Sequence, residues 1–147
     1  MSLAFILTAC GGGYNTDFPP PTGKEKLREL VPAEIGGVAV AAEKLELDAA
    51  EYFGTKSSYG TGASITIVQC KTQDGLDKYV KETVVPSLES YGTRSSGKFN
   101  GVWSLKASGK NGRVHGWQNQ NWLFVISASS DALFDEVVDK FAYIDKK

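Results

Sequence analysis

The chain has 147 residues, 41% hydrophobic and 22% charged, which is the composition of an ordinary globular protein with a single folded domain. Its formal net charge of −1 at pH 7 argues against nucleic acid as a partner, because nucleic-acid-binding domains carry an excess of basic residues. A folded region of this length buries enough surface to form a hydrophobic core.

The N-terminal residues combine a short apolar run with the motif Leu7-Thr8-Ala9-Cys10 and three following glycines. A branched apolar residue, two small residues and a cysteine in this order resemble the lipobox of bacterial lipoproteins. The resemblance implies that a signal peptide, residues 1–9, is removed and that Cys10 is acylated, with palmitate as a typical chain. The apolar run is at the short limit for a signal peptide, and no basic residue precedes it. The alternative is a frayed terminus or a first strand with a buried cysteine.

The same resemblance implies a location. It predicts a lipid anchor in the bacterial cell envelope, with the domain in the periplasm or outside the cell. In a Gram-negative cell the outer membrane is favoured, because glycine and not aspartate follows Cys10. In water, without a bilayer, the apolar residues 1–7 are expected to pack into a groove or along a sheet edge.

Residues 11–23 hold three consecutive prolines and four glycines, a composition typical of a tether between an anchor and a domain. The domain itself is expected over residues 24–147. With Cys10 acylated, no structural disulfide is expected, and Cys70 is expected to be a small buried apolar residue.

The first half of the domain is expected to alternate short elements and turns. A short amphipathic helix is expected over residues 24–31, because Leu27, Leu30 and Val31 lie on one side of it. Pro32 disfavours helix at the residue before it and is expected to end this helix. Strands are expected over residues 38–47, where the alanines also suit a helix, and over residues 63–71, which are rich in β-branched side chains. Turns or loops are expected at residues 35–37, 48–54 and 57–62, and a second strand that opens at Tyr52 is the alternative within residues 48–54.

A long helix is expected over residues 74–90, where apolar side chains recur at helical spacing. Asp74 is expected to be its N-cap. Pro86 lies inside this pattern, so it is expected to kink or divide the helix near Val85.

A three-stranded meander is expected after this helix, following a polar connection at residues 91–97. Its strands are expected over residues 99–107, 113–118 and 121–128. Asn119-Gln120 is expected to form the second turn, although it lacks the glycine that the tightest hairpins prefer.

The last helix is expected to begin at Ser129 or Ser130, whose side chain caps it. Its buried stripe is expected to consist of Phe134, Val137, Val138 and Phe141. This stripe is expected to pack on the sheet residues Ile65, Ile67, Phe124 and Ile126. The order of strands, helix, strands and helix predicts an α+β domain, with an antiparallel sheet of five or six strands and two main helices on one face.

Large side chains on the meander form the main candidate site. With Asn119-Gln120 as the turn, Trp117 lies opposite Trp122, and Trp103 on the preceding strand is able to share their face. The same register sets two further pairs, His115 with Phe124 and Arg113 with Ile126. The functional interpretation is an aromatic platform with a polar rim, for a glycan, a peptide or a lipid. The structural interpretation is a core beneath the helices.

His115 is the single histidine and a potential general base near neutral pH. No nucleophile motif or orienting carboxylate accompanies it, and Cys10, Cys70 and His115 lack the spacing of a metal site. No cofactor or metal is therefore expected. The leading hypothesis is a noncatalytic envelope lipoprotein whose domain binds another envelope component. The alternatives are a hydrolase around His115 and a structural homodimer formed through an uncovered sheet face.

Overall fold

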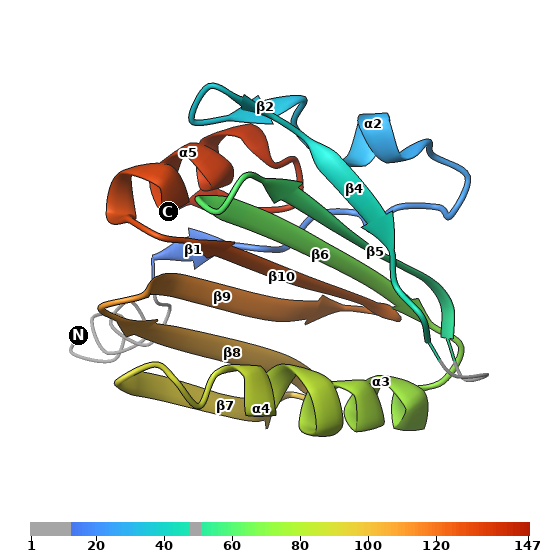
Figure 1. Cartoon of the computed structure of the whole chain (residues 1–147). Helices are drawn as coiled ribbons and strands as arrows, with labels where there is room; N and C mark the ends of the chain where they lie inside the picture. Colours follow the sequence, from blue (N-terminus) through green and yellow to red (C-terminus); the bar gives the residue numbers. More distant parts are fainter. Residues whose placement is uncertain (1–12, 48–50) are drawn as a thin grey trace, which may run out of the picture.

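The structure is a computed structural model that describes residues 13–47 and 51–147. In this part of the chain, seven strands form one antiparallel sheet in the order β4-β5-β6-β10-β9-β8-β7 (Figure 1). They are β4 (Ala41–Lys44), β5 (Glu51–Tyr59), β6 (Ala63–Cys70), β7 (Thr93–Phe99), β8 (Val102–Gly109), β9 (Gly112–Asn119) and β10 (Trp122–Ala128). The two edge strands are β4 and β7.

Short elements surround this sheet. β1 (Tyr14–Asn15) pairs with β11 (Asp145–Lys146), and β2 (Glu34–Ile35) forms a hairpin with β3 (Val38–Ala39). The helices are α2 (Leu27–Leu30), α3 (Gln73–Tyr79), the π-helix η1 (Val80–Val84), α4 (Val85–Ser87) and α5 (Asp131–Lys140). None of the helices in the described part of the chain has the length and hydropathy that a membrane crossing requires.

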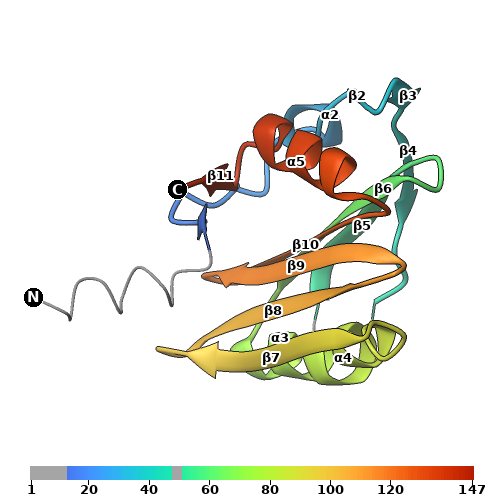
Figure 2. The same cartoon turned by 90° about the vertical axis from the view of Figure 1, so that its left-hand side faces the viewer.

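Apolar side chains point to both faces of the central strands, so each face needs a cover. Phe124 of β10 packs in one core cluster with α5, whereas its neighbour Leu123 packs in a second cluster with α3 and η1. β6 divides in the same way, with Ile67 in the first cluster and Val68 in the second. The helices therefore cover opposite faces, and Figure 2 shows α5 at the top and α3 with α4 at the bottom.

The predicted fold class is therefore wrong. The domain is mostly β, with a seven-stranded sheet in the described residues and a helical element on each face, not an α+β domain with two helices on one face. The prediction failed because it treated the sheet as one-sided, although adjacent residues in β6 and β10 are both apolar. A strand that is buried on both faces has a continuous apolar run instead of an alternating one.

The additional strands come from residues that were expected to be turns. β5 includes residues 51–54 and 57–59 of the predicted turn and loop, and β7 replaces most of the predicted connection at residues 91–97. Residues 48–50 lie outside the described ranges. These segments are rich in Ser, Thr and Gly, so their own strand propensity is low, but pairing with β6 and β8 fixes them as strands.

The predicted turn at residues 35–37 is confirmed as the β2–β3 hairpin, in which Gly36 and Gly37 both have positive φ angles, 60° and 76°. Residues 38–39 and 41–44 are strand, which confirms that choice over helix, while residues 45–47 lie beyond β4. The helix expected at residues 24–31 is confirmed only over its central turn, α2.

The β9–β10 hairpin differs from its predicted register by two residues. Its loop is Gln120-Asn121, with Gln120 at φ 56°, so Trp122 pairs with Asn119 and not with Trp117. The observed pairs are Trp117 with Phe124, His115 with Ile126 and Arg113 with Ala128. Because side chains alternate with a period of two, this shift leaves every residue on its predicted face.

The predicted break at Pro86 takes the form of a π-helical turn. The N–H of Val85 donates to the carbonyl of Val80, five residues earlier. Proline lacks an N–H, and its ring clashes with the carbonyl four residues before it in an α-helix, so a wider turn accommodates it. The N-cap of this helix is Thr72 and not Asp74, because the Thr72 hydroxyl accepts the Gly75 N–H at 3.0 Å.

The last helix and its core are confirmed. Ser130 caps α5 by accepting the Leu133 N–H at 3.2 Å. The predicted stripe is buried in one cluster with all four predicted sheet residues: Phe134, Val137, Val138 and Phe141 with Ile65, Ile67, Phe124 and Ile126. Cys70 is also fully buried, as expected, in the cluster on the α3 face.

Residues 13–23, here called the strap, lie against the domain. The Lys147 N–H donates to the Gly13 carbonyl at 2.9 Å, and β1 pairs with β11 directly after this bond. Further along, the Asn119 side-chain amide donates to the Phe18 carbonyl at 2.5 Å, and Pro21 is buried. The described part of the predicted tether is therefore packed against the domain, from Arg113 at the start of β9 to Asn119 at its end. The acylation predicted at Cys10 and the packing predicted for residues 1–7 lie outside the described residues.

Candidate functional site

A hollow of about 260 Å³ lies beside the strap, over strands β7, β8 and β9. We call it the strap-side hollow. Its lining includes Tyr14, Ser95, Lys106, Ser108, Arg113 and His115. It therefore contains two of the five binding residues predicted from the sequence, Arg113 and His115.

Cross-strand pairing builds the floor of the hollow from two rows of side chains. One row runs from Ser95 through Lys106 to His115, because β8 pairs with both of its neighbours at Lys106. The second row runs in the same way from Thr93 through Ser108 to Arg113. Residues that pair across neighbouring strands share one face of a sheet, so all of these side chains point to the α5 face.

Arg113 is held in place from three sides. Its guanidinium donates to the Tyr14 hydroxyl at 3.1 Å and lies 4.5 Å from the centre of the Phe134 ring. It is also 3.7 Å from the carboxylate of Asp131, an exposed residue in the first turn of α5. The strap and α5 therefore position this cation over the sheet.

His115 is buried at the back of the hollow. Its ring lies 5.3 Å from the Tyr14 ring and 5.5 Å from the Trp117 ring, centre to centre. Burial, together with the charges of Lys106 and Arg113, lowers the pKa of His115 to about 4. The imidazole is therefore neutral at pH 7.

The electrostatic character of the hollow is positive. Two basic side chains, Lys106 and Arg113, lie on its floor, and none of its lining residues is acidic. Arg94 also borders the hollow, but it alternates with Thr93 and Ser95, so its side chain points to the other face of the sheet. There the Arg94 guanidinium donates to the Tyr91 and Glu89 carbonyls, at 2.9 and 3.3 Å. Basic side chains next to hydroxyl groups are the usual surroundings of a bound carboxylate or phosphate. The hollow is therefore suited to an anionic group.

The lowered pKa of His115 predicts that the stability of the domain depends on pH. Its folded-state pKa, about 4, lies below the ordinary value of 6.5, so the unfolded chain binds the proton more readily. The stability that goes with the neutral, buried imidazole is therefore fully present above pH 6.5. It is lost as the pH falls towards 4, which lowers the free energy of unfolding by up to about 3 kcal/mol. Since the chain has one histidine, its NMR titration is read directly. A midpoint near 6.5 in the folded protein would contradict the burial of this ring.

Two of the predicted tryptophans belong to the core on the α5 face. Trp117 is stacked on Phe124 with ring centres 5.4 Å apart, and Trp122 lies 6.4 Å from the same ring. Both are almost fully buried, which supports the structural interpretation of these rings. The edge of Trp122 lines a separate hollow with Gln69 and Asn121.

Trp103 lies on the opposite face, contrary to the prediction that it shares the face of the other tryptophans. Its indole N–H donates to the Asp77 carboxylate at 2.8 Å, and Lys98 approaches the same carboxylate at 3.0 Å. Burial raises the pKa of Asp77, but hydrogen bonds from Trp103, Gln73 and Lys98 outweigh it and lower the pKa to about 2. This network attaches α3 to the β7–β8 hairpin.

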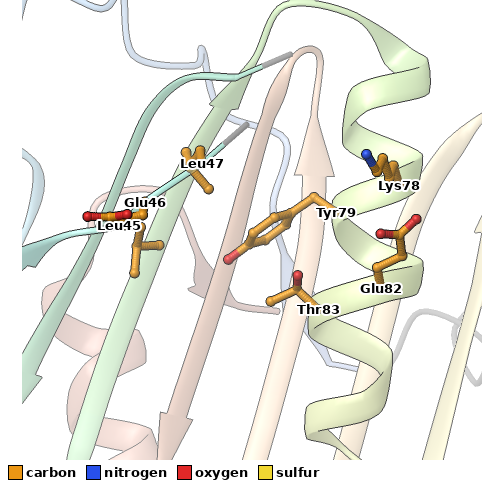
Figure 3. A pocket seen from close by; sticks show the side chains of 7 residues that line it. All are labelled: Leu45, Glu46, Leu47, Lys78, Tyr79, Glu82 and Thr83. Atoms are coloured by element: carbon orange, nitrogen blue, oxygen red, sulfur yellow. The ribbon is translucent and has the colours of Figure 1, made fainter. Parts of the chain in front are cut away.

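A second hollow of about 210 Å³ lies between helix α3–η1 and the segment after β4 (Figure 3). Figure 3 shows the Tyr79 ring reaching from the helix towards Leu45, with Thr83 below it. Leu45, Leu47 and Tyr79 pack against the cluster on the α3 face, so this hollow is a gap at the rim of that core. The π-helical turn beside it is accounted for by Pro86.

Sequence patterns alone missed the other half of the strap-side hollow. Tyr14, Lys106, Ser95 and Ser108 were not expected to join Arg113 and His115. A signal exists in β8, where Ser104, Lys106 and Ser108 alternate with buried apolar residues. No such signal exists for Tyr14, which reaches the hollow through pairing between the two ends of the described chain.

Comparison of the chain with protein-family models, with curated proteins and with solved structures gives no significant match. Among the described residues, no three His, Cys, Asp or Glu side chains are arranged so that they could hold a metal ion. The motif at Cys10 and the strap-side hollow are the two features of the chain that bear on its function.

Proposed function

We propose that this chain is a lipid-anchored protein of the bacterial cell envelope, and that its domain is a noncatalytic binding module. The observation that carries the anchor is the Leu7-Thr8-Ala9-Cys10 motif after an apolar run. Two or more acyl chains on Cys10 hold a protein firmly, because each buried CH₂ contributes about 0.8 kcal/mol. The binding site is the strap-side hollow, and its ligand is an anionic group of another envelope component.

The basic lining of the hollow supports a binding role over a hydrolytic one. A histidine that acts as a general base needs a nucleophile within reach and commonly a carboxylate that orients it. The charged groups that act on His115 are the cations Lys106 and Arg113, and they disfavour the imidazolium that general-base catalysis produces. Lys106 and Arg113 are instead suited to hold an anion against neutral hydrogen-bonding groups.

The anchor is tested by metabolic labelling of cells with a fatty-acid analogue. The parent protein is expected to carry the label, and Cys10→Ala is expected to lose it. Cys70→Ala is the matched control, because it removes the other cysteine, which is buried in the domain. It is expected to remain labelled. Equal labelling of the parent and of Cys10→Ala would show that the protein is not a lipoprotein of this type.

A further inference from the structure

We propose that the strap-side hollow binds the phosphate groups of anionic phospholipids in the anchoring membrane, so that the domain lies on the bilayer through the open α5 face of β7 and β8. This inference rests on the proposed lipid anchor at Cys10. It names the ligand of the hollow and gives the domain an orientation.

The hollow lies a short distance along the chain from the proposed anchor. Cys10 precedes Gly13 by three residues, which span at most about 10 Å when extended. Gly13 is fixed to the domain by the Lys147 N–H, and the next residue, Tyr14, lines the hollow. A lipid on Cys10 therefore keeps the hollow next to the headgroup layer.

The hollow combines positive charge with hydrogen-bond donors. Lys106 and Arg113 stand on the floor of the hollow, with the Ser95, Ser108 and Tyr14 hydroxyls around them. Phosphate oxygens accept from ammonium, guanidinium and hydroxyl donors together. The exposed Asp131 carboxylate lies outside this lining, 3.7 Å from Arg113, and offsets part of the charge of that residue only.

Exposed apolar side chains on the same face favour a lipid over a soluble anion. Among the described residues, Phe99 and Val102 are two of the three large hydrophobic side chains that are exposed, at 66% and 39%. They pair across the β7–β8 hairpin. Side chains alternate along a strand, so Phe99 shares the face of Ser95, and Val102 shares that of Lys106. One face thus combines a basic hollow with exposed apolar side chains, as a membrane interface requires.

The test measures cosedimentation of the unacylated full chain with vesicles at low salt. Vesicles that contain phosphatidylglycerol are expected to bind it more tightly than vesicles of phosphatidylcholine alone. Lys106→Gln is expected to weaken binding to the anionic vesicles about fivefold, the usual effect of one basic residue near such a surface. Phe99→Ser is expected to weaken binding to the same vesicles severalfold.

Two matched variants serve as controls. Lys44→Gln removes an exposed lysine from the opposite edge strand, and Val38→Ser removes the third exposed apolar side chain. Both are expected to bind like the parent. All of these chains carry the same apolar N-terminal residues, so any binding by that segment cancels in the comparison.

The proposal is overturned if Lys106→Gln and Lys44→Gln bind anionic vesicles equally well. It is also overturned if inorganic phosphate shifts the NMR signals of the hollow while anionic vesicles bind no better than neutral ones, since the site then takes a soluble anion. Because the chain in this assay is unacylated, its failure leaves the Cys10 claim intact. If Cys10 is not acylated, the metabolic labelling experiment reveals it, because the parent protein then lacks the fatty-acid label.

Discussion

Replacing Phe141 with alanine is expected to lower the free energy of unfolding by about 3–5 kcal/mol. Phe141 is 2% exposed and closes the core where α5 ends. Its ring lies 5.7 Å from Phe124, 6.3 Å from Trp117 and 5.5 Å from Tyr143, centre to centre. The substitution therefore leaves a cavity among these three rings. Chemical denaturation of the purified protein measures the change.

Phe99→Ala is the matched control for this experiment, because it removes the same side chain from a position that is 66% exposed. It is expected to change the free energy of unfolding by less than about 1 kcal/mol. Similar losses for Phe141→Ala and Phe99→Ala would mean that α5 does not cover the sheet in the way described.

Gly112→Ala is expected to destabilise the domain by at least about 3 kcal/mol, the sum of backbone strain and of a forced shift of neighbouring chain. A Cβ atom at this position would lie 1.9 Å from the Ala128 carbonyl oxygen of β10. Gly112 also has a φ of +111°, which L-residues rarely adopt. It is the first residue of β9, so the clash falls on the strand that carries Arg113 and His115. The same denaturation experiment measures the loss.

Gly101→Ala separates the cost of backbone strain from the cost of shifting the neighbouring chain. Gly101 has a φ of +82°, but an added Cβ there meets no atom within 4 Å. It is expected to show only the strain of the left-handed backbone, about 1–2 kcal/mol. If Gly112→Ala costs no more than Gly101→Ala, then β9 and β10 are not as close at this point as the structure places them.

The parts of the fold that the sequence predicts are those with strong local signals. α5 has a cap and a clear helical stripe from Phe134 to Phe141, and β6 is a β-branched run. Most of β5 and β7 was missed because their central residues are Ser, Thr, Gly, Lys and Arg, and strands of this kind are set by their partners and not by their own propensity. The placement of helices on both faces follows from consecutive buried residues, such as Ile67 and Val68, which a one-sided sheet does not explain.

The candidate site, like the fold, was predicted only where the sequence carries a local signal. Arg113 and His115 were expected to share a face because they are two residues apart on one strand. A register error of two residues does not change the face to which they point. Trp103 was misplaced because the face depends on the β8–β9 register, in which Ser104 and not Trp103 pairs with Trp117. Tyr14 was missed because its partner in the hollow, Arg113, is 99 positions away in the sequence. Local sequence patterns carry no information about such a contact.

The most direct test of the proposed envelope anchor is the intact mass of the protein extracted from its native membrane. The expected mass is that of a chain that begins at Cys10, increased by a diacylglyceryl group and, in cells that modify the free amine, by one further acyl chain. A protein that keeps residues ahead of Cys10 and carries no added acyl mass would contradict the account.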